Sequence, residues 1–314
     1  MAEHRQRGSG VLLVFVLAIQ AVLLFVRLDL LPAWTDEAHT LEVAPLPPGE
    51  IARRVAADVH PPLYFWLAHG WLELPLPGSP LERLRALSGV LVLLTTLVVH
   101  RLWLSRMDAR SSACFLVLWA LSPCLLLYGR MARSYSLQVL VAVVAITVAS
   151  AGLRRPPSLA RALRLGAALA IVLYVHYVPG LALAGAVAIA SCWRALREKN
   201  PRWLGAMAIA NAFALLLYSP WLPALLGALS KWTGRSHPYR VFASPWLDEI
   251  AKIGYGFFSF SFGETPGTAG LVSGAVRAPP LAGVAIGEAA GRARPGGAPL
   301  AASLIGLAVH AVSR

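Results

Sequence analysis

The sequence predicts an all-α polytopic membrane protein, and its composition carries that prediction. Of its 314 residues, 57% are hydrophobic and only 14% are charged, whereas soluble domains carry about a quarter charged residues. Several apolar runs approach the ~20 residues that a helix needs to cross a bilayer. A soluble domain with an unusually apolar core accounts for these two features less well.

The positive charge is distributed as in a membrane protein. The formal net charge is +13, and the arginines cluster in short segments between apolar runs. Such clusters typically face the cytoplasm, whereas a nucleic-acid-binding protein gathers them along one groove or face. We therefore expect a cytoplasmic N-terminus, a multi-pass location in the inner or plasma membrane, membrane lipids as partners and no nucleic acid.

The apolar runs divide residues 1–262 into a series of spans that form one predicted transmembrane domain. The first run is interpreted as an uncleaved helix, because no small-residue cleavage site follows it. The predicted spans cover 11–28, 84–104, 112–128, 135–153, 165–177, 179–193 and 203–222, with a shorter candidate over 250–262.

The last part of the chain has a different composition. Residues 263–314 are rich in Gly, Ala and Pro and contain no aromatic residue. Gly-rich and Pro-rich segments of this kind favour extended or variable conformations. We expect a tail with one short apolar run near its end, and truncation of the chain is one explanation of this change.

The stretch from Trp34 to Trp71 is predicted to lie on the non-cytoplasmic surface and to carry the functional residues. Two prolines, Pro61 and Pro62, suit the first turn of a short helix. That helix contains Tyr64, and aromatic residues of this kind favour the level of the lipid headgroups. Ionisable residues at the edge of a membrane are candidates for function, because holding them there costs free energy.

Two adjacent carboxylates, Asp36 and Glu37, follow Trp34 at the end of the first span. A carboxylate just outside a membrane can act as a general base toward a hydroxyl group. The alternative is that one acid forms an ion pair with an arginine or caps a helix after Thr35. The pattern favours the catalytic interpretation.

Asp58 stands two residues before His60 and forms a second candidate site. With Asp36 or Glu37, this pair could bind a divalent metal ion, or His60 could donate a hydrogen bond to a substrate. The alternative is that His60 caps the helix that the two prolines begin. No firm cofactor follows from these residues.

A third candidate is the segment between the third and fourth spans. Arg130 and Arg133 are three residues apart, so they share one face if this segment is helical. Paired guanidinium groups suit a phosphate, although lipid headgroups are an alternative partner. His176, next to Tyr177, is a weaker candidate because a single histidine at a helix end is usually structural.

These motifs, in this order, resemble the GT-C class of membrane glycosyltransferases. The closest likeness is to the protein O-mannosyltransferases and the bacterial aminoarabinose–lipid A transferases, glycosyltransferase families 39 and 83. The matching pieces are W-T-D-E-A (34–38), H-P-P-L-Y-F-W (60–66), L-E-R-L-R-A-L-S (81–88), R-M-A-R-S-Y-S-L (130–137), H-Y (176–177) and S-P-W-L-P (219–223).

The resemblance implies a bundle of transmembrane helices with interfacial helices in the first outer loop. It also implies transfer of a sugar, with inversion, from a polyprenyl-phosphate donor to a protein, lipid or glycan hydroxyl on the outer face. By position, Asp36 would be the catalytic base and Glu37 the second acid. Arg130 and Arg133 would bind the donor phosphate. The supporting residues would be Asp58, His60, Arg85, Tyr135, His176 and Tyr177.

Two other functions remain open from the sequence. A lipid or glycan transporter would use the same charged residues to bind a headgroup without chemistry, but it would favour internal repeats, which we do not find. A non-catalytic membrane subunit is the second alternative. The sequence leaves the sugar, the acceptor and metal dependence undetermined.

Overall fold

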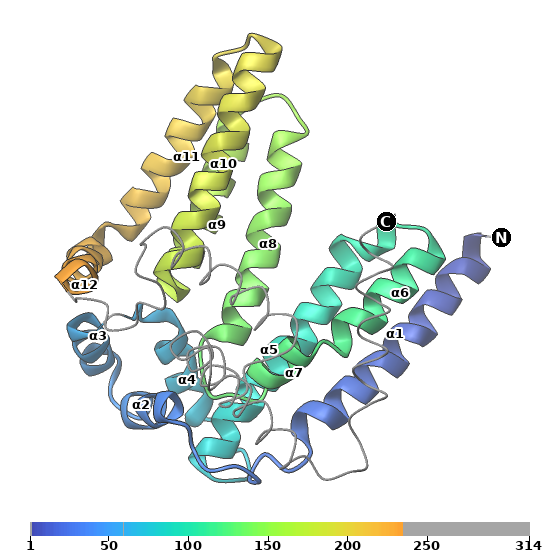
Figure 1. Ribbon diagram of the computed structural model, residues 1–314, viewed down its shortest axis with the longest axis vertical. Helices are drawn as coiled ribbons and strands as arrows, with labels where there is room; N and C mark the ends of the chain where they lie inside the picture. Colours follow the sequence, from blue (N-terminus) through green and yellow to red (C-terminus); the bar gives the residue numbers. More distant parts are fainter. Residues whose placement is uncertain (1, 59, 235–314) are drawn as a thin grey trace, which may run out of the picture. The chain divides into compact units, whose positions relative to one another are not determined.

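The computed structural model describes residues 2–58 and 60–234, and every regular element among them is helical (Figure 1). The predicted eighth span, 250–262, and the tail, 263–314, lie outside the described residues. The α-helices are α1 (Ala2–Phe25), α2 (Thr35–Val43), α3 (Pro48–Ala57), α4 (Leu63–Leu72), α5 (Pro80–Leu102), α6 (Ala109–Ala120), α7 (Pro123–Tyr128), α8 (Tyr135–Leu153), α9 (Leu159–Val175), α10 (Tyr177–Glu198), α11 (Arg202–Tyr218) and α12 (Leu222–Gly234), with short 3-10 helices η1 (Leu104–Arg106) and η2 (Ser219–Trp221).

The prediction of an all-helical chain is confirmed for the described residues, whereas three of the seven spans predicted there (11–28, 112–128 and 165–177) are not among the segments long and apolar enough to cross a membrane. Within the described part of the chain, four helical segments are long and apolar enough to cross a membrane. Two shorter apolar helices, Gly10–Phe25 and Ala109–Ala120, accompany them. The four long segments are Pro80–Arg106, Tyr135–Leu153, Tyr177–Glu198 and Arg202–Ser230.

Two of the predicted spans differ from the observed helices. The span predicted over 112–128 is broken after Ala120, because Ser122 caps a new helix and Pro123 occupies its first turn. The span predicted over 165–177 ends at Val175, where His176 adopts an extended conformation (φ −160°, ψ 131°). His176 Nδ1 then accepts a hydrogen bond from the Val178 amide (3.3 Å) and caps α10.

The apolar helices pack around α5, α8 and α9. Helix α9 contacts α8, α10 and α11, while α5 contacts α8 and α1. The approach of α9 to α11 requires a glycine, since a Cβ atom on Gly166 would lie 2.5 Å from the Ala210 carbonyl oxygen. These contacts hold the ends of α5 and α8 beside each other, where the loop residues of the candidate site meet.

Helices α2, α3 and α4 connect α1 to α5 and bury one face each (Figure 1). Ile51 and Val55 are fully buried, while Arg53 and Arg54 are exposed, so α3 is amphipathic. Tyr64 is buried in the main core because α4 packs on α5 and α9. Trp66, on the same helix, is 37% exposed.

Candidate active site

A buried ion pair between Glu37 and Arg85 lies at the start of α2. Glu37 is completely buried, and Arg85, on α5, is 5% exposed. The guanidinium group donates from Nε to Glu37 Oε1 (2.9 Å) and from Nη2 to Oε2 (2.6 Å), which makes the pair bidentate. Charge-assisted hydrogen bonds of this geometry are among the strongest in proteins.

The remaining N–H groups of Arg85 bind the backbone of one loop. Arg85 also donates to the carbonyl oxygens of Leu28 (2.7 Å), Leu31 (2.8 Å) and Pro32 (3.1 Å). These bonds hold the loop that joins α1 to α2 against α5. Breaking this pair would therefore release the whole connection.

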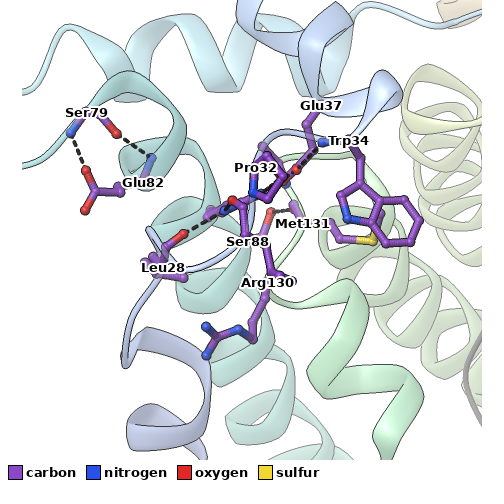
Figure 2. Close-up of polar contacts among 12 residues, drawn as sticks. Leu28, Pro32, Trp34, Glu37, Ser79, Glu82, Ser88, Arg130 and Met131 are labelled. Carbon is purple, nitrogen blue, oxygen red and sulfur yellow. Dashed lines mark hydrogen bonds and ion pairs between the residues drawn. The ribbon is translucent and has the colours of Figure 1, made fainter. Parts of the chain in front are cut away.

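Glu37 accepts two backbone hydrogen bonds besides those from Arg85. The donors are the amides of Trp34 (3.0 Å), which Figure 2 shows beside it, and of Ala132 (2.8 Å). Burial alone would raise the pKa of Glu37, but Arg85 and the two amides together lower it below its ordinary value of 4.5. Glu37 is therefore ionised, paired and inaccessible to a substrate, so we assign it a positioning role rather than the catalytic one that the sequence suggests.

Asp36, one residue earlier on α2, is exposed. Its side chain is 55% accessible to solvent, because adjacent positions on a helix point about 100° apart and Glu37 is directed inward. Arg133 lies beneath it, with Nη1 donating to the Asp36 carbonyl oxygen (3.2 Å) and Nη2 at 3.9 Å from Asp36 Oδ2. Asp36 therefore presents a free carboxylate face next to a buried cation.

Asp58, His60 and Arg133 form a hydrogen-bonded chain that leads to Asp36. His60 Nδ1 lies 2.9 Å from Asp58 Oδ2, and Arg133 Nη2 lies 3.0 Å from His60 Nε2. A guanidinium group can only donate, so Nε2 accepts and Nδ1 carries the proton that is donated to Asp58. Burial, and then the charge of Arg133, lower the pKa of His60 below 6.5, which keeps the ring neutral.

The expectation that His60 caps α4 is not met, because the helix has no side-chain cap and His60 makes these two contacts instead. The two ring nitrogens of His60 are hydrogen-bonded to Arg133 and Asp58. His60 therefore sets the position of Arg133, and through it the surroundings of Asp36.

Arg130 and Arg133 do not form the expected pair. Residues 129–134 form turns and bends instead of a helix, so the two side chains point in different directions. Arg130 donates to the carbonyl oxygens of Leu23 (2.6 Å), Val26 (2.8 Å) and Arg27 (2.9 Å), where it caps the C-terminus of α1. Figure 2 shows Arg130 directed away from Glu37 and Trp34. Arg133 alone therefore faces Asp36.

The other predicted supporting residues are His176, Tyr177 and Tyr135. Burial and, to a smaller extent, the charges of His60 and Arg133 lower the pKa of His176. The Tyr177 hydroxyl accepts a hydrogen bond from Trp221 Nε1 (3.0 Å) and is buried. The Tyr135 ring packs edge-on against Tyr128. Both tyrosines therefore have structural contacts.

Sequence reasoning gave little weight to His39, which the structure places in the cluster. His39 lies one helical turn after Asp36 on α2, and this i, i+3 spacing was the available signal. Its Nε2 atom is buried, lies 3.7 Å from Asp58 Oδ2 and makes no hydrogen bond with the described residues. The His39 and His60 rings are 5.7 Å apart.

The structure corrects the set of residues that could hold a metal ion. Ligand atoms of His39, Asp58 and His60 all lie within 4.8 Å of one another, whereas Asp36 and Glu37, named from the sequence, are not in this group. A cation bound at His60 Nδ1 would have to displace the proton donated to Asp58, because metal ligands bind through a lone pair. The observed hydrogen bonds and such a cation therefore exclude each other.

Comparisons of this chain with protein-family models, with curated proteins and with solved structures give no match.

Replacing Glu37 by Gln should lower the stability of the protein strongly. The change leaves the Arg85 cation buried without a counter-charge, and breaking such a pair costs about 3–5 kcal/mol. We expect a large fall in melting temperature of the detergent-solubilised protein. Glu42→Gln is the matched control, because Glu42 forms an exposed pair with Arg54 (3.0 Å) and exposed pairs contribute about 0–1 kcal/mol. Equal melting temperatures for the two variants would contradict the assignment.

Lowering the pH should reduce the stability of the folded protein through protonation of His60. The folded pKa of His60 is lowered from 6.5, so its contribution is complete above pH 6.5 and is lost as the pH falls through the folded value. We expect the melting temperature of the wild type to fall over this range and the slope to be smaller in His60→Asn. Identical pH profiles for the two proteins would rule out this role.

Proposed function

We propose that this chain is an inverting glycosyltransferase with a GT-C-type helix bundle, acting on a polyprenyl-phosphate sugar at the non-cytoplasmic face of a plasma membrane. The observation that carries the proposal is the contrast between two adjacent acids. Glu37 is fully buried and paired, while Asp36 is exposed beside the buried Arg133. A site that holds one carboxylate rigidly and leaves its neighbour free suits a general base.

In the proposed reaction, Asp36 acts as the general base. The Asp36 carboxylate takes the proton of an acceptor hydroxyl, whose oxygen then attacks the anomeric carbon of the donor. The bond between that carbon and the phosphate oxygen breaks, and the electron pair leaves on the phosphate. Attack from the side opposite the leaving group inverts the anomeric centre, and a single base suffices because no covalent intermediate is needed.

Arg133 is the residue positioned to stabilise the leaving phosphate. Its Nη2 atom donates to His60 Nε2 (3.0 Å) and lies 3.9 Å from Asp36 Oδ2, beyond hydrogen-bond distance, so its second N–H is available to an arriving anion. A fixed cation next to developing negative charge lowers the barrier because no solvent has to reorganise. Asp58 and His60 support Arg133 from the opposite side.

The surrounding fold supports a lipid-linked donor. Three helices, α2 to α4, lie between α1 and α5, where the GT-C resemblance expects interfacial helices. Four apolar segments long enough to cross a membrane accompany them. The acceptor that fits this site is a hydroxyl of a protein, lipid or glycan.

Asp36→Asn should abolish transfer while leaving the fold intact, because Asp36 is exposed and its carboxylate is not part of the buried pair. Losing a general base typically costs ~10²–10⁴-fold in rate. Purified protein in liposomes would be given a panel of polyprenyl-phosphate sugars and hydroxyl acceptors, with Glu42→Gln as the control for an exposed acid.

Two outcomes would contradict the proposal. Full transfer by Asp36→Asn would remove Asp36 from the chemistry. A wild-type protein that binds the donor but neither transfers nor hydrolyses the sugar would favour a lipid transporter or a non-catalytic subunit.

A further inference from the structure

A cavity lies at the C-terminal ends of α5 and α8, at the opposite end of these helices from the candidate active site. Arg85 lies near the first residue of α5, and the cavity begins at Trp103, just beyond the last. At a rise of 1.5 Å per residue, these two positions are about 27 Å apart along the helix. The cavity is therefore separate from the candidate active site.

The cavity has the size of a ligand site and combines apolar and cationic walls. Its volume is about 420 Å³, within the ~300–1,000 Å³ typical of small-molecule sites. None of its lining residues is acidic. They are Trp103, Arg106, Ile146, Thr147, Ser150, Ala151, Arg154 and Arg155.

Within the described part of the chain, the three arginines of the cavity have no partner for their charge. Among the described residues, Arg106, Arg154 and Arg155 form no ion pair and no side-chain hydrogen bond. Arg130 and Arg194, by contrast, are occupied: Arg130 caps α1, and Arg194 pairs with Glu198 (2.8 Å). The helix dipoles of α5 and α8 place about half a negative charge at each C-terminus. This offsets only part of the charge of the three arginines, so the cavity keeps a net positive charge.

The apolar part of the lining places this charge at a membrane boundary. The cavity is at the C-terminal ends of two segments long enough to span a membrane, Pro80–Arg106 and Tyr135–Leu153. Trp103 donates from Nε1 to Thr147 Oγ1 (2.8 Å), which fixes the ring across the two helices. An indole at a span end is typical of the headgroup level, and arginine-rich connections typically face the cytoplasm.

We propose that this cavity binds the phosphate of an anionic phospholipid from the cytoplasmic leaflet. The three guanidinium groups bind the phosphodiester, and the Ser150 hydroxyl adds a further donor. Ile146 and Ala151 contact the start of the acyl chains. The site is independent of the chemistry proposed at Asp36.

The test is lipid binding by the purified full chain in a neutral detergent, measured as the rise in melting temperature on titration with phosphatidylglycerol. The pocket variant replaces the three cavity arginines by glutamine: Arg106→Gln, Arg154→Gln and Arg155→Gln. We expect its half-saturating lipid concentration to rise about tenfold or more, since each arginine near an anionic lipid contributes a separable electrostatic gain.

The control variant removes the same charge elsewhere. Arg101→Gln, Arg110→Gln and Arg197→Gln change exposed arginines outside the cavity, and lipid binding should change less than twofold. Equal weakening in both triple variants would show only general attraction to anionic lipid and would overturn the proposal. If the pocket variant fails to fold, the single variants Arg106→Gln and Arg154→Gln replace it in the test. Wild-type lipid affinity in both single variants would contradict the proposal.

Two comparison ligands identify the source of the phosphate. Phosphatidylcholine, with no net charge, should give little stabilisation. Inorganic phosphate at millimolar concentration should not compete, because it lacks the acyl chains that contact the apolar wall. Stabilisation by inorganic phosphate equal to that by the lipid would overturn the lipid assignment in favour of a soluble anion.

Discussion

The bidentate pair between Glu37 and Arg85 is the interaction on which the arrangement of the candidate site depends. Desolvating two charges is expensive, and the cost is offset only when every remaining polar atom finds a partner. Here the additional partners are backbone groups of the loop after α1 and of the 129–134 segment. One buried pair therefore binds two connections that are about 100 residues apart in the sequence. Asp36 lies just after the first of them, and Arg133 lies within the second.

The sequence predicts most of the observed apolar helices, because such helices depend on local composition. Apolar runs identify helices without knowledge of their neighbours, and acids beside a span are unusual wherever they occur. Even so, Ser122 and Pro123 break a span that hydropathy alone presents as continuous. Here the helix cap at Ser122 and the proline after it end one helix and start another, although the mean hydropathy of the run is that of a continuous span.

The roles within the site could not be predicted, because they depend on contacts between distant residues. Asp36 and Glu37 are equivalent as a motif, and only the position of Arg85, 48 residues later, decides which acid is buried. Arg130 donates hydrogen bonds to carbonyl groups at the end of α1. The spacing of residues in the sequence does not reveal this contact. His39 joins Asp58 only through the packing of α2 beside the loop before α4.

The most direct test of this account is amide hydrogen exchange, followed by mass spectrometry, in the wild type and in Arg85→Met. Arg85 donates to the 28–32 loop but makes no hydrogen bond to residues 129–134, which are reached only through Glu37. If the pair holds both connections, exchange should accelerate in both segments, while the interface of α9 with α11 stays protected. Faster exchange in the 28–32 loop alone would show that the two connections are held independently, and would contradict the central role of the pair.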